Sequence, residues 1–352
     1  MKRLLSMIFV FTTILIGLSS TTEVKAAENN TIIYFYSPSC LGCLELEEQG
    51  YLEQIENAGI IIHKIDISGV NDFEIPANVI YNEDCLDTMK RMDDNSIDLI
   101  VTSPPYADRR KSTYGGIHPD EYSKWFLGIS SELKRVLSPS GSFILNIKEN
   151  VVDGERHTYV LELIIELRKQ GWLWTEEYMW HKKNSFPGYW PNRLRDGWER
   201  LLHFTKEKKF NMYQDQVKIP IGSWAKTRLE NPTKYDQERQ ESSVGSGFGV
   251  KRANWVDKDL VLPNNVLHMA SEAGNKSHSA VFPEKLPEFF INLFTESNDV
   301  VYDPFMGSGT TAKVASQMNR NFIGSEISEE YYEVSKKRIS HNENVKKFFK
   351  WK

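Results

Sequence analysis

The chain has 352 residues, 40% of them hydrophobic, and a formal net charge of -5, which is ordinary for a folded protein of one or two domains. This acidic balance excludes a basic surface over the whole molecule, so any nucleic-acid surface must be local. Three cysteines are too few for a disulfide framework or a four-cysteine zinc site, and we expect no metal.

Residues 1–26 are similar to a secretory signal. Lys2 and Arg3 precede an apolar run, and small residues near Ala26 offer a cleavage site. A membrane anchor is the alternative, although the run is short for a spanning helix.

Residues 27–75 resemble the start of a thioredoxin-like fold. Strand patterns at 31–36 and 60–65 flank Cys40 and Cys43, which form a CxxC where a helix would begin. The later strands of such a fold are absent. A secreted thiol–disulfide protein is therefore one alternative function, but it accounts for less than a quarter of the chain.

From residue 76 the pattern changes to alternating strands and helices. Uninterrupted apolar strands suit a parallel sheet that is covered on both faces. The order predicts a doubly wound, mostly parallel α/β domain. We expect strands at 79–81, 97–101, 142–147, 172–180 and 200–205, and helices at 121–137 and 159–168.

The sequence TSPPY at 102–106 directly follows the second of these strands. Two prolines cannot extend a ladder, and they leave carbonyls free to accept hydrogen bonds. Ser103 adds a small acceptor and Tyr106 a stacking face. This combination suits the exocyclic amine of a planar base, whereas a simple turn is the structural alternative.

Residues 206–265 are polar and interrupt the domain. The pattern predicts either a solvated insertion or a target-recognition segment whose cations meet phosphates. The candidate cations within it are Lys226, Arg228, Lys251 and Arg252.

Residues 266–345 carry a second motif, DPFMGSGTT at 303–311, between a strand and a helix. The glycines allow close backbone approach, and a helix N-terminus favours polar or anionic groups. Glu326 ends the next apolar run, a position that suits a ribose diol. The spacing is neither GxGxxG nor a phosphate loop.

Together the two motifs resemble the amino-methylating DNA methyltransferases, over about residues 78 to 339. TSPPY is similar to the catalytic motif of that family and DPFMGSGTT to its S-adenosylmethionine motif. Their order is typical of the circularly permuted branch called β. The resemblance implies a Rossmann-like sheet in two parts, with the catalytic half at 76–205, a DNA-recognition insertion at 206–265 and the cofactor half at 266–345.

The resemblance also implies roles for individual residues. The catalytic set is Ser103, Pro104, Pro105 and Tyr106. The cofactor set is Asp303, Pro304, Phe305, Gly307, Gly309, Thr310, Glu326, Asp84, Cys85 and His278. Tyr122 and Trp125 could flank the cofactor, although core packing is an alternative. The set expected to meet DNA is Lys182, Lys183, Arg193 and Arg195, together with the four cations of the insertion.

The implied reaction moves a methyl group from S-adenosylmethionine to a flipped base in double-stranded DNA. Serine before PPY favours N4 of cytosine, with N6 of adenine as the alternative. Some relatives have a carboxylate at the end of the following strand, where this chain has Asn146. Water or Glu149 would then take the proton. Because of Asn146, a DNA-binding module that lacks catalysis is a further alternative function.

The resemblance also implies a partner and a compartment. A cognate restriction endonuclease is a possible partner, and no membrane is expected for this part. The expected location is the cytoplasm, with which the signal-like segment conflicts unless it is a fusion or a gene-prediction artefact.

Overall fold

The computed structural model divides into two compact units, residues Met1–Glu74 and Ile75–Lys352. It describes residues 31–36, 61–66, 77–109, 115–185, 188–189, 191–231, 233–234, 258–271 and 282–340. In the first unit, β1 (Thr31–Tyr36) and β2 (Ile61–Asp66) pair in parallel. The signal-like segment and the CxxC pair lie outside the described residues, so their interpretation stays a prediction.

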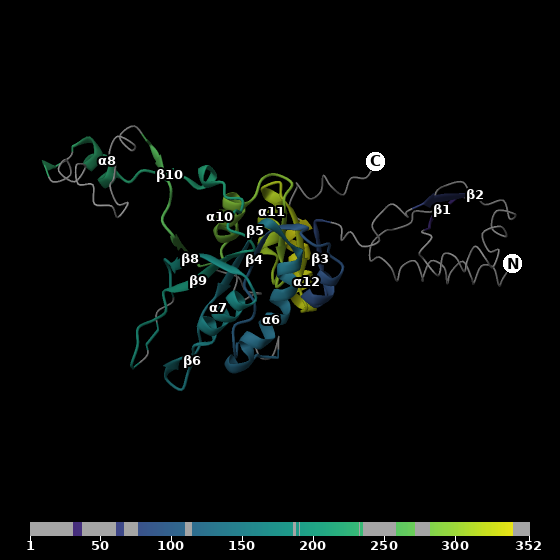
Figure 1. Cartoon of the computed structure of the whole chain (residues 1–352), viewed down its shortest axis with the longest axis horizontal. Helices are drawn as coiled ribbons and strands as arrows, with labels where there is room; N and C mark the ends of the chain where they lie inside the picture. Colours follow the sequence, from purple (N-terminus) through teal and green to yellow (C-terminus); the bar gives the residue numbers. More distant parts are fainter. Residues whose placement is uncertain are drawn as a thin grey trace. The chain divides into compact units, whose positions relative to one another are not determined.

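The second unit is built on an eight-stranded sheet with the order β12-β8-β9-β5-β4-β13-β14-β3 (Figure 1). Neighbouring strands are parallel except at β9, which runs antiparallel to both β5 and β8. The strands are β3 (Val79–Tyr81), β4 (Ile97–Thr102), β5 (Leu137–Ile147), β8 (Leu173–Lys182), β9 (Trp198–Thr205), β12 (Val266–Met269), β13 (Val300–Asp303) and β14 (Asn321–Ser325). The predicted doubly wound sheet is therefore confirmed.

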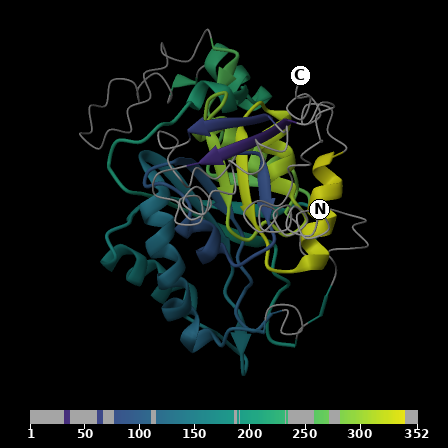
Figure 2. The ribbon, with the colours of Figure 1, turned by 90° about the vertical axis from the view of Figure 1, so that its right-hand side faces the viewer.

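Helices cover both faces of this sheet (Figure 2). One face carries α4 (Cys85–Lys90), α6 (Pro119–Val136) and α7 (Tyr159–Lys169), and the other carries α10 (Lys285–Phe294), α11 (Thr310–Gln317) and α12 (Glu329–Ser340). Side chains of one strand alternate between the two cores: Phe143 and Leu145 pack with α6 and α7, and Ile144 packs with α10. This double burial is why the central strands β4 and β13 are mainly apolar.

Helix α6 shows how local sequence sets these elements. Pro119 occupies the first turn, where its missing N–H costs nothing, and the ring of His118 accepts from the amide of Asp120. Its buried residues recur at helical spacing, among them Tyr122, Phe126, Ile129 and Leu133.

The predicted boundaries hold for most elements, and β5 is the main correction. We expected a strand from 142, but β5 begins at Leu137, directly after α6. The extension is possible because Leu137 pairs with Ile97 before the register shifts and Ser142 pairs with Leu99.

The remaining elements are short. They are β6 (Val151–Val152), β7 (Glu155–Arg156), η1 (Gln214–Val217), β10 (Ile219–Pro220), α8 (Ser223–Glu230) and β11 (Leu260–Val261). Helix α8 buries none of its residues, as expected for a polar insertion. In the described part of the chain, no helix combines the length and the apolar character that crossing a membrane requires.

Candidate active site

The two sequence motifs meet at the carboxyl edge of the sheet. Strands β4 and β13 are direct neighbours, although about 200 residues separate them, and Tyr302 pairs with Ile100. Each strand ends where its motif begins, so the loops after Thr102 and Asp303 lie side by side. This edge is where open α/β sheets bind ligands.

Asp303 joins the two loops through its carboxylate. Oδ1 accepts from the Thr102 hydroxyl at 2.6 Å and the Phe305 amide at 3.1 Å, and Oδ2 accepts from the Thr311 hydroxyl at 2.7 Å. The side chain is only 1% exposed, and burial raises its pKa to about 6. Asp303 therefore fixes the loop geometry from beneath the surface.

The Gly-rich loop is shaped by backbone conformations and by Glu326. Gly307 and Gly309 both have positive φ, 54° and 81°. The amide of Gly307 donates to Glu326 Oε2 at 2.7 Å, and Ser328 donates to Oε1 at 2.8 Å. The carboxylate that we expected at a ribose thus holds this loop, and it is 3% exposed.

Helix α12 supports the same loop from behind. The guanidinium of Arg338 donates to Ser308 at 3.2 Å and Thr310 at 2.9 Å, and it pairs with Glu284 at 2.7 Å. Gly309 lies against this helix so closely that an added Cβ would be 2.9 Å from Cβ of Ser335. The hydrogen bonds of Arg338 and the close approach of Gly309 to Ser335 therefore hold the loop against α12.

The loop after β4 is anchored through its aromatic neighbours. The hydroxyl of the buried Tyr122 donates to the Pro105 carbonyl at 2.9 Å. The Trp125 ring lies 5.2 Å from that of Tyr122 and 6.0 Å from that of Phe305, centroid to centroid. Of the two aromatics predicted near the cofactor, Tyr122 belongs to the core and Trp125 contacts the Gly-rich loop.

Tyr106 is held by a carboxylate that sequence reasoning did not single out. Its hydroxyl donates to Glu199 Oε2 at 2.7 Å, and Ser103 Oγ lies 3.4 Å from the same hydroxyl. Glu199 also accepts from the Asn146 amide at 3.1 Å and pairs with Lys182 at 2.5 Å. Burial raises the pKa of Tyr106 well above its ordinary value, with the Glu199 charge adding to the effect.

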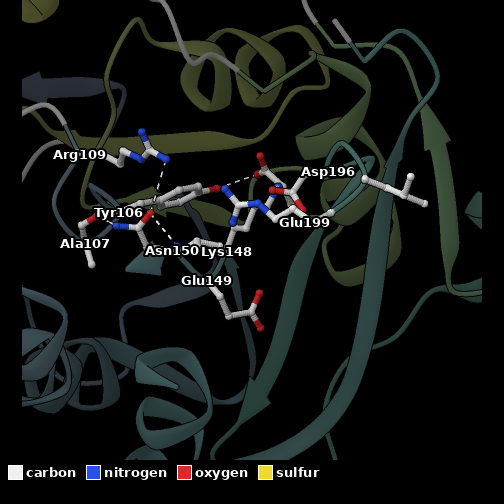
Figure 3. A pocket seen from close by; sticks show the side chains of 11 residues that line it. Tyr106, Ala107, Arg109, Lys148, Glu149, Asn150, Asp196 and Glu199 are labelled. Carbon is white, nitrogen blue, oxygen red and sulfur yellow. Dashed lines mark hydrogen bonds and ion pairs between the residues drawn. The ribbon is translucent and has the colours of Figure 1, made fainter. Parts of the chain in front are cut away.

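A cavity of about 250 Å³ opens beside this network (Figure 3). Tyr106 and Glu199 line it together with Ala107, Arg109, Lys148, Glu149, Asn150, Val151, Arg193, Leu194 and Asp196. Its walls carry both cations and carboxylates, and Lys148 pairs with Asp196 at 2.9 Å. The volume suits one planar base with part of its sugar, and the charged rim suits phosphate.

Asp84 and Cys85, which were also predicted to meet the cofactor, lie at the same edge of the sheet. Asp84 follows β3 and caps α4, accepting from the Leu86 amide at 2.8 Å. Cys85 is buried, and burial raises the pKa of its thiol to about 12, so it is a packing residue rather than a nucleophile. His278 lies outside the described residues.

The predicted DNA-binding cations have different environments. Lys182 is turned toward Glu199, Arg193 lines the cavity, and Arg195 donates to the Ser185 carbonyl at 3.1 Å. In the insertion, Arg228 lies over the Trp224 ring at 5.1 Å and Lys226 is 3.8 Å from Asp259. Lys183 is exposed, directly after β8. Lys251 and Arg252 lie outside the described residues.

Glu199, Arg109 and Lys148 are the site residues that sequence reasoning missed. Glu199 offered no clear signal, because it is the second residue of β9 and stands between Trp198 and Arg200; only the structure shows that it is 7% exposed. A buried acid needs hydrogen-bonding or charged partners, and such an arrangement is typical of functional sites. Arg109 and Lys148 offered no signal, since they resemble any other surface cation.

Comparisons with known proteins agree with this geometry. A family model described as DNA methylase matches residues 97–337. The chain is 30% identical over 284 residues to the type II methyltransferase M.PvuII of Proteus hauseri, covering 75% of this chain and 84% of the relative. It is 32% identical over 254 residues to the orphan methyltransferase M.BamHII of Bacillus amyloliquefaciens, covering 70% and 90%.

Among solved structures, it resembles the PvuII DNA methyltransferase described as cytosine-N4-specific. The TM-score is 0.57 and the identity 26%, over 76% of this chain and 88% of that one.

Proposed function

The chain belongs to the DNA methylase family, whose members methylate N4 of cytosine or N6 of adenine, and on this premise we propose that it methylates N4 of cytosine in duplex DNA. One observation carries the proposal: Ser103 and Tyr106 lie in the loop after β4, next to the Gly-rich loop, and Tyr106 lines a cavity of the size of a base. The solved relative described as cytosine-N4-specific supports cytosine over adenine.

S-adenosylmethionine is the methyl donor, and when bound it supplies a methyl carbon made electrophilic by a sulfonium. The residues present fit it. Glu326 offers a carboxylate of the kind that holds ribose hydroxyls, at the end of β14. Phe305 and Trp125 offer an aromatic wall, and the loop before α11 brings backbone close enough to contact a ligand. These residues would hold the donor at the edge shared by β13 and β14.

The target amine is oriented by the loop after β4. The base must leave the stack, because its amine is otherwise paired, and unstacking costs a few kcal/mol. Ser103 Oγ and the Pro104 carbonyl accept the amine hydrogens, which aims the nitrogen lone pair at the methyl carbon. The Tyr106 ring supports the base from one side. Much of the rate gain is positioning, which can supply up to roughly 7–11 kcal/mol.

Cations around the cavity hold the DNA backbone. Arg109 and Arg193 line the opening in which the nucleotide would sit. Arg228 and Lys226 lie on the insertion, where they can meet phosphates further along the duplex. A restriction endonuclease of the same specificity is the partner we propose, and the cytoplasm, where donor and chromosome meet, is the proposed location.

The adenine alternative rests on the chemistry of the amine. Both exocyclic amines need the same two acceptors, and the family includes enzymes of both kinds. A larger purine would have to fit the same cavity.

Methylation of unmodified DNA tests the function directly. The purified protein, S-adenosylmethionine and unmodified genomic DNA should give N4-methylcytosine at one short sequence, which sequencing that detects modified bases would locate. Ser103→Ala should lower the rate by about 10²-fold or more, because the amine loses an oriented acceptor. Methyladenine at the site would establish the alternative, and no modified base at all would refute the proposal.

A further inference from the structure

We propose that the Glu199 carboxylate receives the proton that the target amine gives up, by way of Tyr106 and Ser103. The inference rests on the proposed function and adds a residue to it. Glu199 belongs to neither sequence motif, because β9 brings it to the site from another part of the chain.

The reaction leaves one proton to be removed. The amine nitrogen forms a bond to the methyl carbon while the carbon–sulfur bond breaks and its electron pair stays on sulfur. The nitrogen then carries a positive charge and one hydrogen more than the product. A hydroxyl such as Ser103 is too weak a base to keep that proton, so an acceptor must lie beyond it.

The hydrogen bonds of the site run in one direction. Glu199 can only accept, so the Tyr106 hydroxyl donates to it at 2.7 Å. The Tyr106 oxygen is then the acceptor for Ser103 Oγ at 3.4 Å, a long contact of the kind that tightens when substrate binds. The lone pairs of Ser103 remain available for the amine. A proton taken up by Ser103 is passed on to Tyr106 as Ser103 gives up its own, and Tyr106 in turn protonates Glu199.

The other two carboxylates of the cavity pair with cations, as Glu199 does with Lys182, but in the described part of the chain no hydrogen bond joins them to the TSPPY loop. Glu149 pairs with Arg200 at 2.6 Å and lies 3.8 Å from Arg156. Asp196 pairs with Lys148 at 2.9 Å and Arg156 at 3.1 Å. Of the three carboxylates that line the cavity, Glu199 is the one with a hydrogen bond to the TSPPY loop. Glu149, which we expected as an alternative to water, is less suited to take the proton because its two oxygens face Arg200 and Arg156.

Asn146 and Lys182 both hold the Glu199 carboxylate in place. Asn146 occupies the end of β5 and donates to Glu199 Oε2, so the two neighbouring strands share one hydrogen-bonded unit. A carboxylate at both positions would place two negative charges about 3 Å apart. Lys182 holds the second oxygen of Glu199, which fixes the orientation of the first toward Tyr106.

Two variants and one control test the inference. Glu199→Gln keeps the shape and the hydrogen bond to Tyr106 but has no carboxylate. Tyr106→Phe keeps the ring and removes the middle oxygen. Glu177→Gln is the control, since it removes another strand carboxylate that pairs with Arg200 outside the cavity. The measurements are the single-turnover methylation rate, the dissociation constants for DNA and S-adenosylmethionine, and the Tm.

We expect Glu199→Gln to lower the single-turnover rate by about 10²-fold, in line with the loss of a general base. Tyr106→Phe should lower it by about tenfold or more, whereas both variants should bind DNA and donor within about twofold of wild type. Glu177→Gln should leave the rate within about twofold.

An unchanged rate in Glu199→Gln, or a loss explained by weaker binding or a lower Tm, would overturn the inference. If Glu199→Gln does not fold, an unchanged rate in Tyr106→Phe would overturn it in the same way. Failure of the wild type to methylate any DNA is a different outcome, because it would refute the proposed function itself.

Discussion

Asp303 is a buried side chain that positions both loops of the site without reaching its surface. Its two oxygens accept three hydrogen bonds, from the last residue of β4, from its own loop and from α11. Because the hydroxyls of Thr102 and Thr311 would otherwise be buried without this partner, each bond also avoids a desolvation cost. The carboxylate thus keeps the two loops in one fixed relation.

Asp303 also predicts a pH dependence of stability. Its carboxyl keeps a proton up to about pH 6 in the folded protein, whereas the ordinary value is 3.8. Between these values the folded state binds more protons than the unfolded state, so stability falls as pH rises through this range. We expect wild type to lose about 3 kcal/mol relative to Asp303→Asn between pH 3.5 and 6.5.

Urea unfolding of both proteins at several pH values would measure the difference. Titrating groups that the two proteins share cancel in this comparison. Parallel curves for wild type and Asp303→Asn would show that the folded-state pKa of this carboxyl is not raised.

At the scale of elements, the Gly-rich loop and α12 form one unit. Gly309 is the N-cap of α11 and has a φ of 81°, which side chains rarely adopt. An added Cβ would meet Cα and Cβ of Ser335 at 3.1 and 2.9 Å, and backbone at that distance cannot move cheaply. The loop therefore requires glycine for two independent reasons.

Gly309→Ala should destabilise the protein by about 2 kcal/mol and weaken S-adenosylmethionine binding by roughly tenfold. Gly128→Ala is the matched control. Gly128 lies inside α6 with nothing within 4 Å of an added Cβ, so alanine should stabilise the protein by about 0.5–1 kcal/mol. Chemical denaturation and calorimetric titration would measure both effects. Equal stability of the two variants would contradict the close contact with α12.

The elements also show what sequence could and could not predict. The apolar runs predicted β4, β13 and β14, because a strand that is buried on both faces consists mainly of apolar residues. The helical spacing of apolar residues predicted α6 and α7. The motif residues Ser103, Tyr106 and Asp303 were found because chemistry and position coincide in a short stretch. Glu199 was not, because its role arises only when β9 pairs with β5. Pairing direction is set by the whole sheet and leaves no local pattern.

At the scale of the whole molecule, the sheet brings the two ends of the second unit together. Its first strand, β3, pairs in parallel with its last, β14. The amide of Asn78 donates to the Phe322 carbonyl at 2.6 Å, and Glu326 donates back to the Tyr81 carbonyl at 2.9 Å. This pairing closes the edge of the sheet beside β14, whereas the catalytic and cofactor loops themselves meet through β4 and β13.

This closure predicts that the second unit works without the first. Strand β3 begins at Val79, and the two core clusters of the sheet contain no described residue before it. A shortened protein that starts at Asp72 keeps β3, both cores and both loops, so it should methylate DNA within about twofold of the full chain.

Methylation rate and thermal unfolding of the two proteins would be compared side by side. A second shortened protein, starting at Glu83, is the matched control. It lacks β3 and should be destabilised by several kcal/mol, because the edge of β14 loses its partner and Ile80 leaves the core. If the protein starting at Asp72 folds but no longer methylates DNA, the first 71 residues take part in the site.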